Sequence, residues 1–170
     1  MERELATLTI LAEVTVAFVA FSAIIASLRV TLGKKLTEFQ NLLVHFFTEC
    51  GMLGVSVALL PLVLSGFWQE ELIVARYTIL YTIVSTTTYL VYYVRRRLKI
   101  SAPTPLPSLI VMIGYGVWIA VLAVTLTEIF WKPSLAIVAA VCLWALCSGA
   151  VIFVSFLATF VDRESEASEE

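Results

Sequence analysis

The chain has 170 residues, of which 61% are hydrophobic and 14% are charged, and its mean hydropathy is +0.98. Soluble domains are usually near half apolar, with about a quarter of their residues charged. The composition therefore predicts an integral membrane protein whose surroundings are the lipid bilayer, and it excludes a soluble nucleic-acid-binding protein.

Five long apolar segments follow one another along the chain, separated by short clusters of charge. A membrane-spanning helix needs about 20 apolar residues at a rise of about 1.5 Å per residue. The segments that reach this length are 5–28, 41–64, 72–94, 107–127 and 133–161. We therefore predict an all-α fold in which residues 1–161 form a single bundle of five transmembrane helices, and residues 162–170 form a short, acidic, disordered tail.

The basic residues predict the orientation of this bundle. Of the 11 Lys and Arg residues, eight follow the first, third or fifth segment, and the remaining three lie on the other side. The eight are Arg29, Lys34, Lys35, Arg95, Arg96, Arg97, Lys99 and Arg163. Because short cytoplasmic loops are enriched in Lys and Arg, this alternation places the N-terminus outside and the C-terminus inside.

The first segment contains one acidic residue within its apolar run, Glu13. The residues that share its helix face are small or short: Ala6, Thr9, Ala17, Ala20 and Ser27. Faces of this kind let membrane helices approach one another closely. We therefore expect Glu13 to point at protein and not at lipid.

The second segment carries the stretch LLVHFFTECG, residues 42–51, which combines His45, the single histidine of the chain, with Glu49. Residues four apart share a helix face, so His45, Glu49 and the earlier Asn41 form one polar stripe. A hydrogen bond between the imidazole and the carboxylate would lower the cost of burying both. A carboxylate in the bilayer costs several kcal/mol unless it is neutralised or paired, and such residues usually have a function.

Three residues of the second segment predict a deformable helix: Gly51, Gly54 and Pro61. Proline cannot donate a hydrogen bond to the carbonyl one turn earlier, which favours a kink. A hinge above a polar stripe is typical of a helix that gates. The alternative is that the glycines serve packing and the proline makes a static kink, since prolines are well tolerated in membrane helices.

The third segment is rich in hydroxyl groups. Counting the helical rise from the inner edge places residues 85–88 near the depth of Glu49, and Tyr81 near the depth of Glu13. Tyr115 in the fourth segment also falls near Glu49. The sequence therefore predicts an intramembrane polar site that either handles protons or a cation, or clamps helices together. Its residues are Glu13, His45, Glu49, Tyr81 and Thr87.

A basic cluster follows the third segment and consists of Arg95, Arg96, Arg97 and Lys99. Four to eight bases beside a membrane span can hold anionic lipid headgroups. The topology rule alone accounts for the same cluster, so ordinary topology charges are the simpler interpretation.

The sequence contains little that indicates catalysis. Cys50, Cys142 and Cys147 lie inside apolar segments without a CxxC pair, which favours buried thiols. No nucleophile–base pair, HExxH motif, phosphate loop or nucleotide motif is present. One histidine and Glu49 supply only two metal ligands. We therefore expect no enzyme activity, no metal and no cofactor.

The sequence LAEVTVAFVAFSAIIASL, residues 11–28, resembles the opening helix of a group of small bacterial multi-span membrane proteins. In that group an acidic residue after LA precedes an FxxF or FxG spacing, and the matching positions here are Glu13, Phe18 and Phe21. The group's second helix often carries LLPL, which residues 59–62 match. The resemblance implies that Glu13 is a feature of the group, and it implies no particular activity. Together with the basic loops, it predicts a location in the bacterial inner membrane.

Two functions fit these patterns. The first is a small transport or channel-like subunit, in which Glu13, His45 and Glu49 take up protons or a cation and the path forms between protomers. The second is a non-transporting accessory or scaffold protein, whose polar groups clamp helices or dock a partner. In both cases we expect a homo-oligomer or a complex with a membrane partner protein. The intramembrane carboxylates favour the first function.

Overall fold

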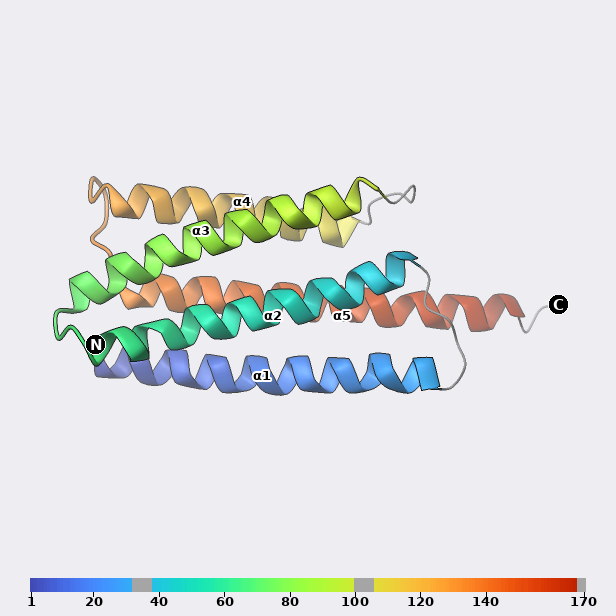
Figure 1. Ribbon diagram of the computed structural model, residues 1–170. Coiled ribbons are helices and arrows are strands. Elements are labelled where there is room, and N and C mark those ends of the chain that lie inside the picture. The colour runs from blue at the N-terminus through green and yellow to red at the C-terminus, as the bar shows by residue number, and fades with distance from the viewer. Residues whose placement is uncertain (32–37, 100–105, 168–170) are drawn as a thin grey trace.

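The computed structural model describes residues 1–31, 38–99 and 106–167, and within them the chain is all-α (Figure 1). The five helices are α1 (Glu2–Thr31), α2 (Glu38–Ser65), α3 (Glu71–Arg97), α4 (Leu106–Leu126) and α5 (Leu135–Ala167). Each helix coincides with one of the five predicted segments, with ends that differ by a few residues in most cases. The all-α fold with five helices is therefore confirmed.

The helices lie lengthwise beside one another, with α2 and α5 in the middle, α1 on one side and α3 and α4 on the other (Figure 1). Helix α5 contacts each of the other four helices, and α2 contacts α1, α3 and α5. Successive helices alternate in direction, so the start of α1 and the end of α5 lie at opposite ends of the bundle (Figure 1).

The last helix extends further than the apolar segment 133–161 predicted. Helix α5 continues to Ala167, so residues 162–167, which were predicted to belong to a disordered tail, are helical. Glutamate and alanine are good helix formers, which explains why the acidic sequence prolongs α5. Residues 168–170, the remainder of the predicted tail, lie outside the described residues.

Within the described ranges, four helices are long and apolar enough to cross a membrane, namely α1, α2, α4 and α5. Helix α3 is also long, at 27 residues, but it is much less apolar because it carries four arginines and a run of Ser, Thr and Tyr. Length and composition therefore support a membrane protein, with α3 as the most polar helix of the bundle.

Helix α1 packs through a stripe whose positions alternate by four and three residues. The buried residues of this stripe are Leu8, Ala12, Thr15, Val19, Ser22 and Ala26. This spacing is that of a coiled-coil seam, which keeps one face of α1 against its neighbours along its whole length. Gly51 of α2 lies against Val19, and a Cβ atom at this position would overlap Cγ2 of Val19. Gly51 therefore permits the close approach of the two backbones.

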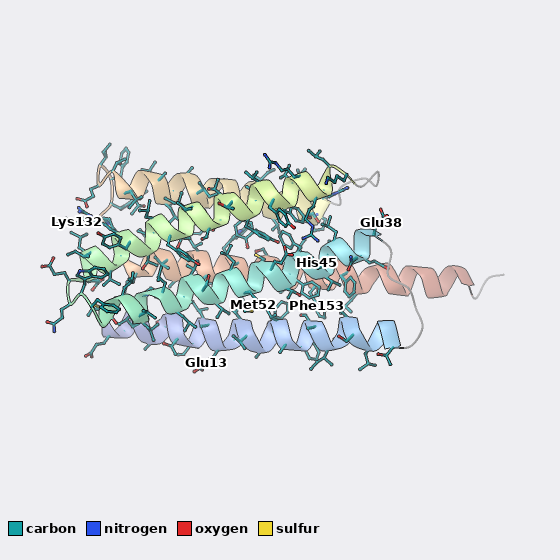
Figure 2. The ribbon with its side chains drawn as sticks, viewed as in Figure 1. Glu13, Glu38, His45, Met52, Lys132 and Phe153 are labelled. Atoms are coloured by element: carbon teal, nitrogen blue, oxygen red, sulfur yellow. The ribbon has the colours of Figure 1, made fainter. Side chains whose placement is uncertain are left out.

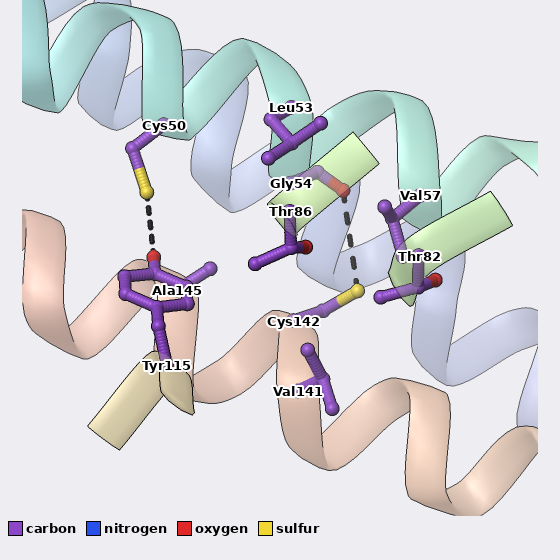
Figure 3. Close-up of a pocket in the computed structure, with 10 residues that line it drawn as sticks. All are labelled: Cys50, Leu53, Gly54, Val57, Thr82, Thr86, Tyr115, Val141, Cys142 and Ala145. Carbon is purple, nitrogen blue, oxygen red and sulfur yellow. Dashed lines mark hydrogen bonds between the residues drawn. The ribbon is translucent and has the colours of Figure 1, made fainter. Parts of the chain in front are cut away.

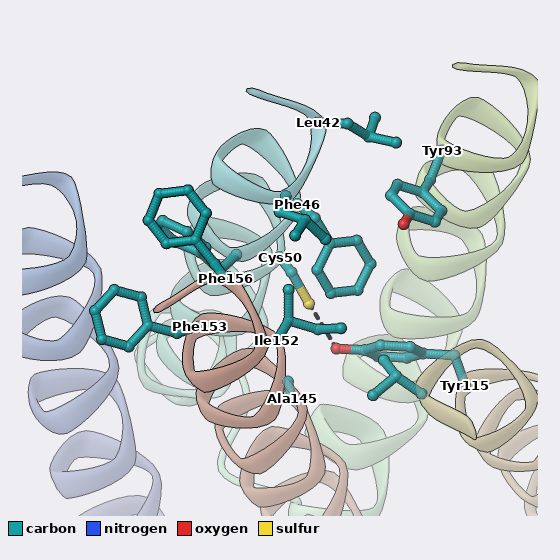
Figure 4. Close-up of a cluster of buried hydrophobic side chains, with 12 residues drawn as sticks. Leu42, Phe46, Cys50, Tyr93, Tyr115, Ala145, Ile152, Phe153 and Phe156 are labelled. Atoms are coloured by element: carbon teal, nitrogen blue, oxygen red, sulfur yellow. Dashed lines mark hydrogen bonds between the residues drawn. The ribbon is translucent and has the colours of Figure 1, made fainter. Parts of the chain in front are cut away.

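The core divides into two clusters along the length of the bundle. One is aromatic, and its rings meet mostly edge to face, as in Phe46 against Tyr93 with ring centroids 4.7 Å apart (Figure 4). The other is aliphatic and lies around Leu8, Val74 and Leu135. The polar residues of LLVHFFTECG thus lie on the segment of α2 that packs into the aromatic cluster.

Candidate functional site

The polar stripe of α2 meets the last turn of α3. Nδ1 of His45 lies 3.4 Å from Oε1 of Glu49, and Nη1 of Arg96 donates to the same Oε1 at 3.0 Å. The guanidinium of Arg96 also lies over the ring of Tyr92, 5.2 Å from its centroid. These four side chains, His45, Glu49, Tyr92 and Arg96, form a cluster that we call the α2–α3 ion cluster.

The local helix geometry explains the ion cluster. His45 and Glu49 are four residues apart and therefore adjoin on one face of α2, as the sequence predicted. Helical side chains lean toward the N-terminus of their own helix, so the long side chain of Arg96 reaches back from the end of α3 toward Glu49. Glu49 and Arg96 are 35% and 27% exposed, so the ion pair lies at the outer edge of the α2–α3 contact and not in a sealed core.

The sequence pattern did not predict Arg96 as the partner of Glu49. The depth count placed residues 85–88 beside Glu49, because it counted backbone rise alone and ignored the length of an arginine side chain. The sequence did contain a signal for this pairing: Arg96 lies in the last turn of the next helix, and its long side chain can span the difference in depth between its backbone and the Glu49 carboxylate. The depth of Tyr115 was estimated correctly, because its hydroxyl contacts Cys50, the residue after Glu49.

Glu13 lies apart from the ion cluster. Its side chain points outward from the bundle (Figure 2), and Ala6, Ala17 and Ala20 on the same face of α1 are also exposed. Glu13 therefore does not face another helix of this chain, and it does not join His45 and Glu49 in the predicted intramembrane polar site. The reason is geometric: Glu13 follows Ala12, which belongs to the buried stripe, and consecutive residues lie about 100° apart around a helix.

The two predicted hydroxyl residues of α3 also face outward. Tyr81 is exposed, with its hydroxyl 3.1 Å from Oγ of Ser56, and Thr87 is exposed. The buried hydroxyl residues of α3 are Thr78, Thr82, Thr86 and Tyr93. Thr78 and Thr82 donate to carbonyls one turn earlier in α3, at 2.8 and 2.7 Å, so their polarity is satisfied within the helix.

A separate polar contact lies inside the bundle. Sγ of Cys50 is 2.6 Å from the hydroxyl of Tyr115 (Figure 4), and that hydroxyl is 3.2 Å from Oγ of Ser148. These residues link α2, α4 and α5. The hollow beside them, lined also by Cys142 and Thr86, has a volume of about 10 Å³ (Figure 3). This volume is about that of a single water site.

The thiols follow the prediction in part. Cys50 and Cys142 are buried, as expected, and Sγ of Cys142 lies 3.9 Å from the carbonyl oxygen of Gly54 (Figure 3). Cys147 is exposed, which contradicts the expectation of a buried thiol. It follows the buried residue Ala145 by two positions and therefore lies on a different face of α5.

The proposed hinge residues lie in a continuous helix. Helix α2 runs without interruption through Gly51, Gly54 and Pro61, and all three are buried. A Cβ atom at Gly54 would lie 3.7 Å from that of Ala145, so Gly54 faces α5 while Gly51 faces α1. This arrangement supports the packing alternative for the glycines, and hinge motion stays a prediction.

The basic cluster at the end of α3 is divided among three environments. Arg95 is exposed, Arg96 is paired with Glu49, and Arg97 is 7% exposed. Lys99 is exposed, and its backbone N–H donates to the carbonyl of Arg96 at 3.3 Å. The four bases therefore do not form one continuous cationic surface.

The opposite end of the bundle has its own ion pairs. Arg76 of α3 donates to Glu128, which follows α4. The amino group of Met1 lies 2.8 Å from Glu4 and 2.9 Å from Glu71. The Arg76–Glu128 and Met1–Glu71 pairs join neighbouring helix ends, and the Met1–Glu4 pair lies at the start of α1.

The fold and these contacts define the class: an all-α bundle of five helices, four of them able to cross a membrane, with an ion cluster at one helix seam. No protein-family model matches the chain, and no curated protein or solved structure is significantly similar to it.

Proposed function

We propose that this protein is a non-transporting accessory or scaffold protein of the membrane, which acts by contacting another protein within the bilayer. The observation that supports this proposal is that the carboxyl groups of Glu13 and Glu49 lie in different parts of the bundle. Glu49 is paired with Arg96 at the α2–α3 seam, whereas Glu13 points out of the bundle. Polar groups that converged on an interior hollow would favour transport, and here the hollow beside Cys50 and Tyr115 has room for about one water.

The outward carboxyl group of Glu13 is the feature that calls for a partner. A carboxylate that faces lipid costs several kcal/mol, and a hydrogen-bonding partner lowers that cost. Exposed small side chains flank Glu13 and allow another helix to approach closely. The partner is a second copy of this chain or a different membrane protein.

We also propose that all five helices cross the bilayer, with the N-terminus outside and the C-terminus inside, in a bacterial inner membrane. Helix α3, although polar, is about 40 Å long and packs beside α2 and α4. Two of its inward threonines, Thr78 and Thr82, bond to their own helix carbonyls, which lowers the cost of placing them at membrane depth. The distribution of the bases, eight against three, supports the orientation.

Reporter fusions at the C-terminus test the topology. A fluorescent protein fused there should be fluorescent, and an alkaline phosphatase fused there should be inactive, because the first folds inside and the second is active only outside. The reverse pattern would show that α3 does not cross or that the bundle is inverted.

The size of the protein in mild detergent tests the scaffold function. We expect the parent protein to migrate as a particle larger than a monomer, and Glu13→Leu to convert it to a monomer. Glu70→Gln, which removes an exposed carboxyl group from the loop before α3, is the matched control and should leave the size unchanged. An oligomeric parent whose size Glu13→Leu leaves unchanged would contradict the proposal, whereas a monomeric parent would mean that the partner of Glu13 is a different membrane protein.

A flux assay separates the two functions directly. Liposomes that contain the protein should conduct protons no faster than protein-free liposomes. A proton or cation flux that Glu49→Gln abolishes without unfolding the protein would overturn the scaffold function and establish the transport function.

A further inference from the structure

A polar hollow opens at the end of the bundle where α2 begins and α3 ends. Its volume is about 240 Å³, and its lining combines charged, amide and apolar side chains. The lining residues are Glu38, Asn41, Leu42, Arg96 and Lys99. The hollow is distinct from the interior contact at Cys50 and Tyr115, and it adjoins the α2–α3 ion cluster through Arg96.

The charges around the hollow are mixed. Arg96 and Lys99 contribute two positive charges, but Glu38 contributes a negative charge and Glu49 is paired with Arg96. Arg97 is buried and does not line the hollow. A purely anionic headgroup would meet the Glu38 carboxylate, whereas a headgroup with both a phosphate and an amine would match both signs of charge.

The geometry points to a binding site for the phosphoethanolamine headgroup of a membrane lipid, with the phosphate at Arg96 and Lys99 and the primary ammonium at Glu38. Arg96 donates from Nη1 to Glu49, and a guanidinium has five N–H donors in all. The turn after α3, in which Lys99 bonds back to the carbonyl of Arg96, keeps the two bases together. Charge-assisted hydrogen bonds of this kind are the strong ones.

The position of the hollow suits a lipid. Glu38 lies at the end of the bundle where α2 begins (Figure 2), and the α2 face that carries His45 continues through the middle of the bundle and toward its opposite end with Met52, Leu59 and Val63. These three apolar side chains are exposed, and residues at intervals of three, four and seven lie along one side of a helix. An acyl chain that follows this stripe leads from the hollow into the bilayer. The inference goes beyond the proposed function and does not depend on what Glu13 contacts.

Native mass spectrometry of the delipidated full chain with added lipids tests the inference. We expect phosphatidylethanolamine to be retained more strongly than phosphatidylglycerol, which lacks the amine, and phosphatidylcholine, whose trimethylammonium cannot donate N–H bonds to Glu38. Lys99→Ala should lower the retention of phosphatidylethanolamine about tenfold, the effect of one charge-assisted hydrogen bond. Lys99→Arg should retain the lipid.

Substitution of Glu38 tests the lipid preference most directly. Glu38→Gln removes the negative charge from the lining, so it should abolish the preference for phosphatidylethanolamine over phosphatidylglycerol. Lys132→Ala is the matched control, because Lys132 is an exposed lysine at the opposite end of the bundle (Figure 2). Thermal unfolding of each variant in detergent identifies any loss of the fold.

Three results would overturn the inference. The first is equal retention of the three lipids by the parent protein, and the second is an equal effect of Lys99→Ala and Lys132→Ala. The third is saturation by soluble phosphoethanolamine, tested as a competitor, without any retention of phosphatidylethanolamine. That result would assign the hollow to a soluble ligand of the same chemistry.

Discussion

Glu13 on α1 and Glu49 on α2 are both acidic residues in long apolar helices, but the fold treats them differently. Glu49 lies at a helix seam, where Arg96 donates to it and His45 adjoins it. Glu13 lies on the outer face of α1, among exposed alanines. An acidic residue in an apolar segment therefore does not by itself indicate an interior site, because the packing of its helix decides which way it points.

Gly51→Ala tests whether α1 is oriented so that Glu13 points outward. Of the substitutions considered, it should cause the largest loss of stability. The added Cβ atom would overlap Val19, so the variant should lower the free energy of unfolding by about 1–3 kcal/mol. Unfolding in mixed micelles with increasing sodium dodecyl sulfate measures this change.

Gly116→Ala is the control for that variant, because a Cβ atom at Gly116 meets nothing within 4 Å. The control should be neutral or slightly stabilising, since alanine favours a helix over glycine. Combining Val19→Ala with Gly51→Ala should restore part of the stability. If Gly51→Ala left the free energy of unfolding unchanged, α1 would have to be rotated about its axis relative to this structure, and Glu13 would point in another direction.

Arg96→Met tests the pairing of Glu49. The variant leaves the Glu49 carboxylate without the guanidinium and should destabilise the protein by about 1 kcal/mol, the upper range for a partly exposed ion pair. A double-mutant cycle with Glu49→Gln isolates the coupling between the two side chains. Strictly additive effects would show that the pair contributes nothing to stability.

Tyr115→Phe tests the interior contact beside Glu49. The variant removes the hydroxyl that links Cys50 and Ser148 and should cost about 0.6 kcal/mol, the average for hydrogen bonds between membrane helices. The same micelle unfolding measures it, with Tyr92→Phe, a change at an exposed tyrosine, as the control. An equal effect of the two variants would show that the interior hydroxyl has no special role.

Glu13→Gln should have the smallest effect on the isolated bundle. Because Glu13 is exposed, the free energy of unfolding of the monomer should change by less than about 0.5 kcal/mol, while Glu49→Gln should lower it more. If Glu13→Gln destabilised the protein as much as Glu49→Gln or more, Glu13 could not be an unpaired, outward-facing residue of the monomer.

Much of the architecture was predictable from the sequence because helix length in a bilayer follows from apolar length alone. The segments around 5–28 and 107–127 coincide with α1 and α4 to within a few residues. The contact of His45 with Glu49 was also predictable, since it depends only on a spacing of four within one helix. The helical continuation of α5 to Ala167 was missed because the acidic composition was given more weight than the helix propensity of its residues.

The sequence by itself thus determined the number of helices, their approximate ends and the contacts within each helix, all of which depend on neighbouring residues along the chain. The tertiary structure decided that Glu13 faces outward, that Arg96 and not a hydroxyl of α3 reaches Glu49, and that Thr82 rather than Thr87 faces inward. These features depend on the rotation of each helix about its axis. That rotation is set by close packing between helices, such as Gly51 against Val19, which no single segment specifies.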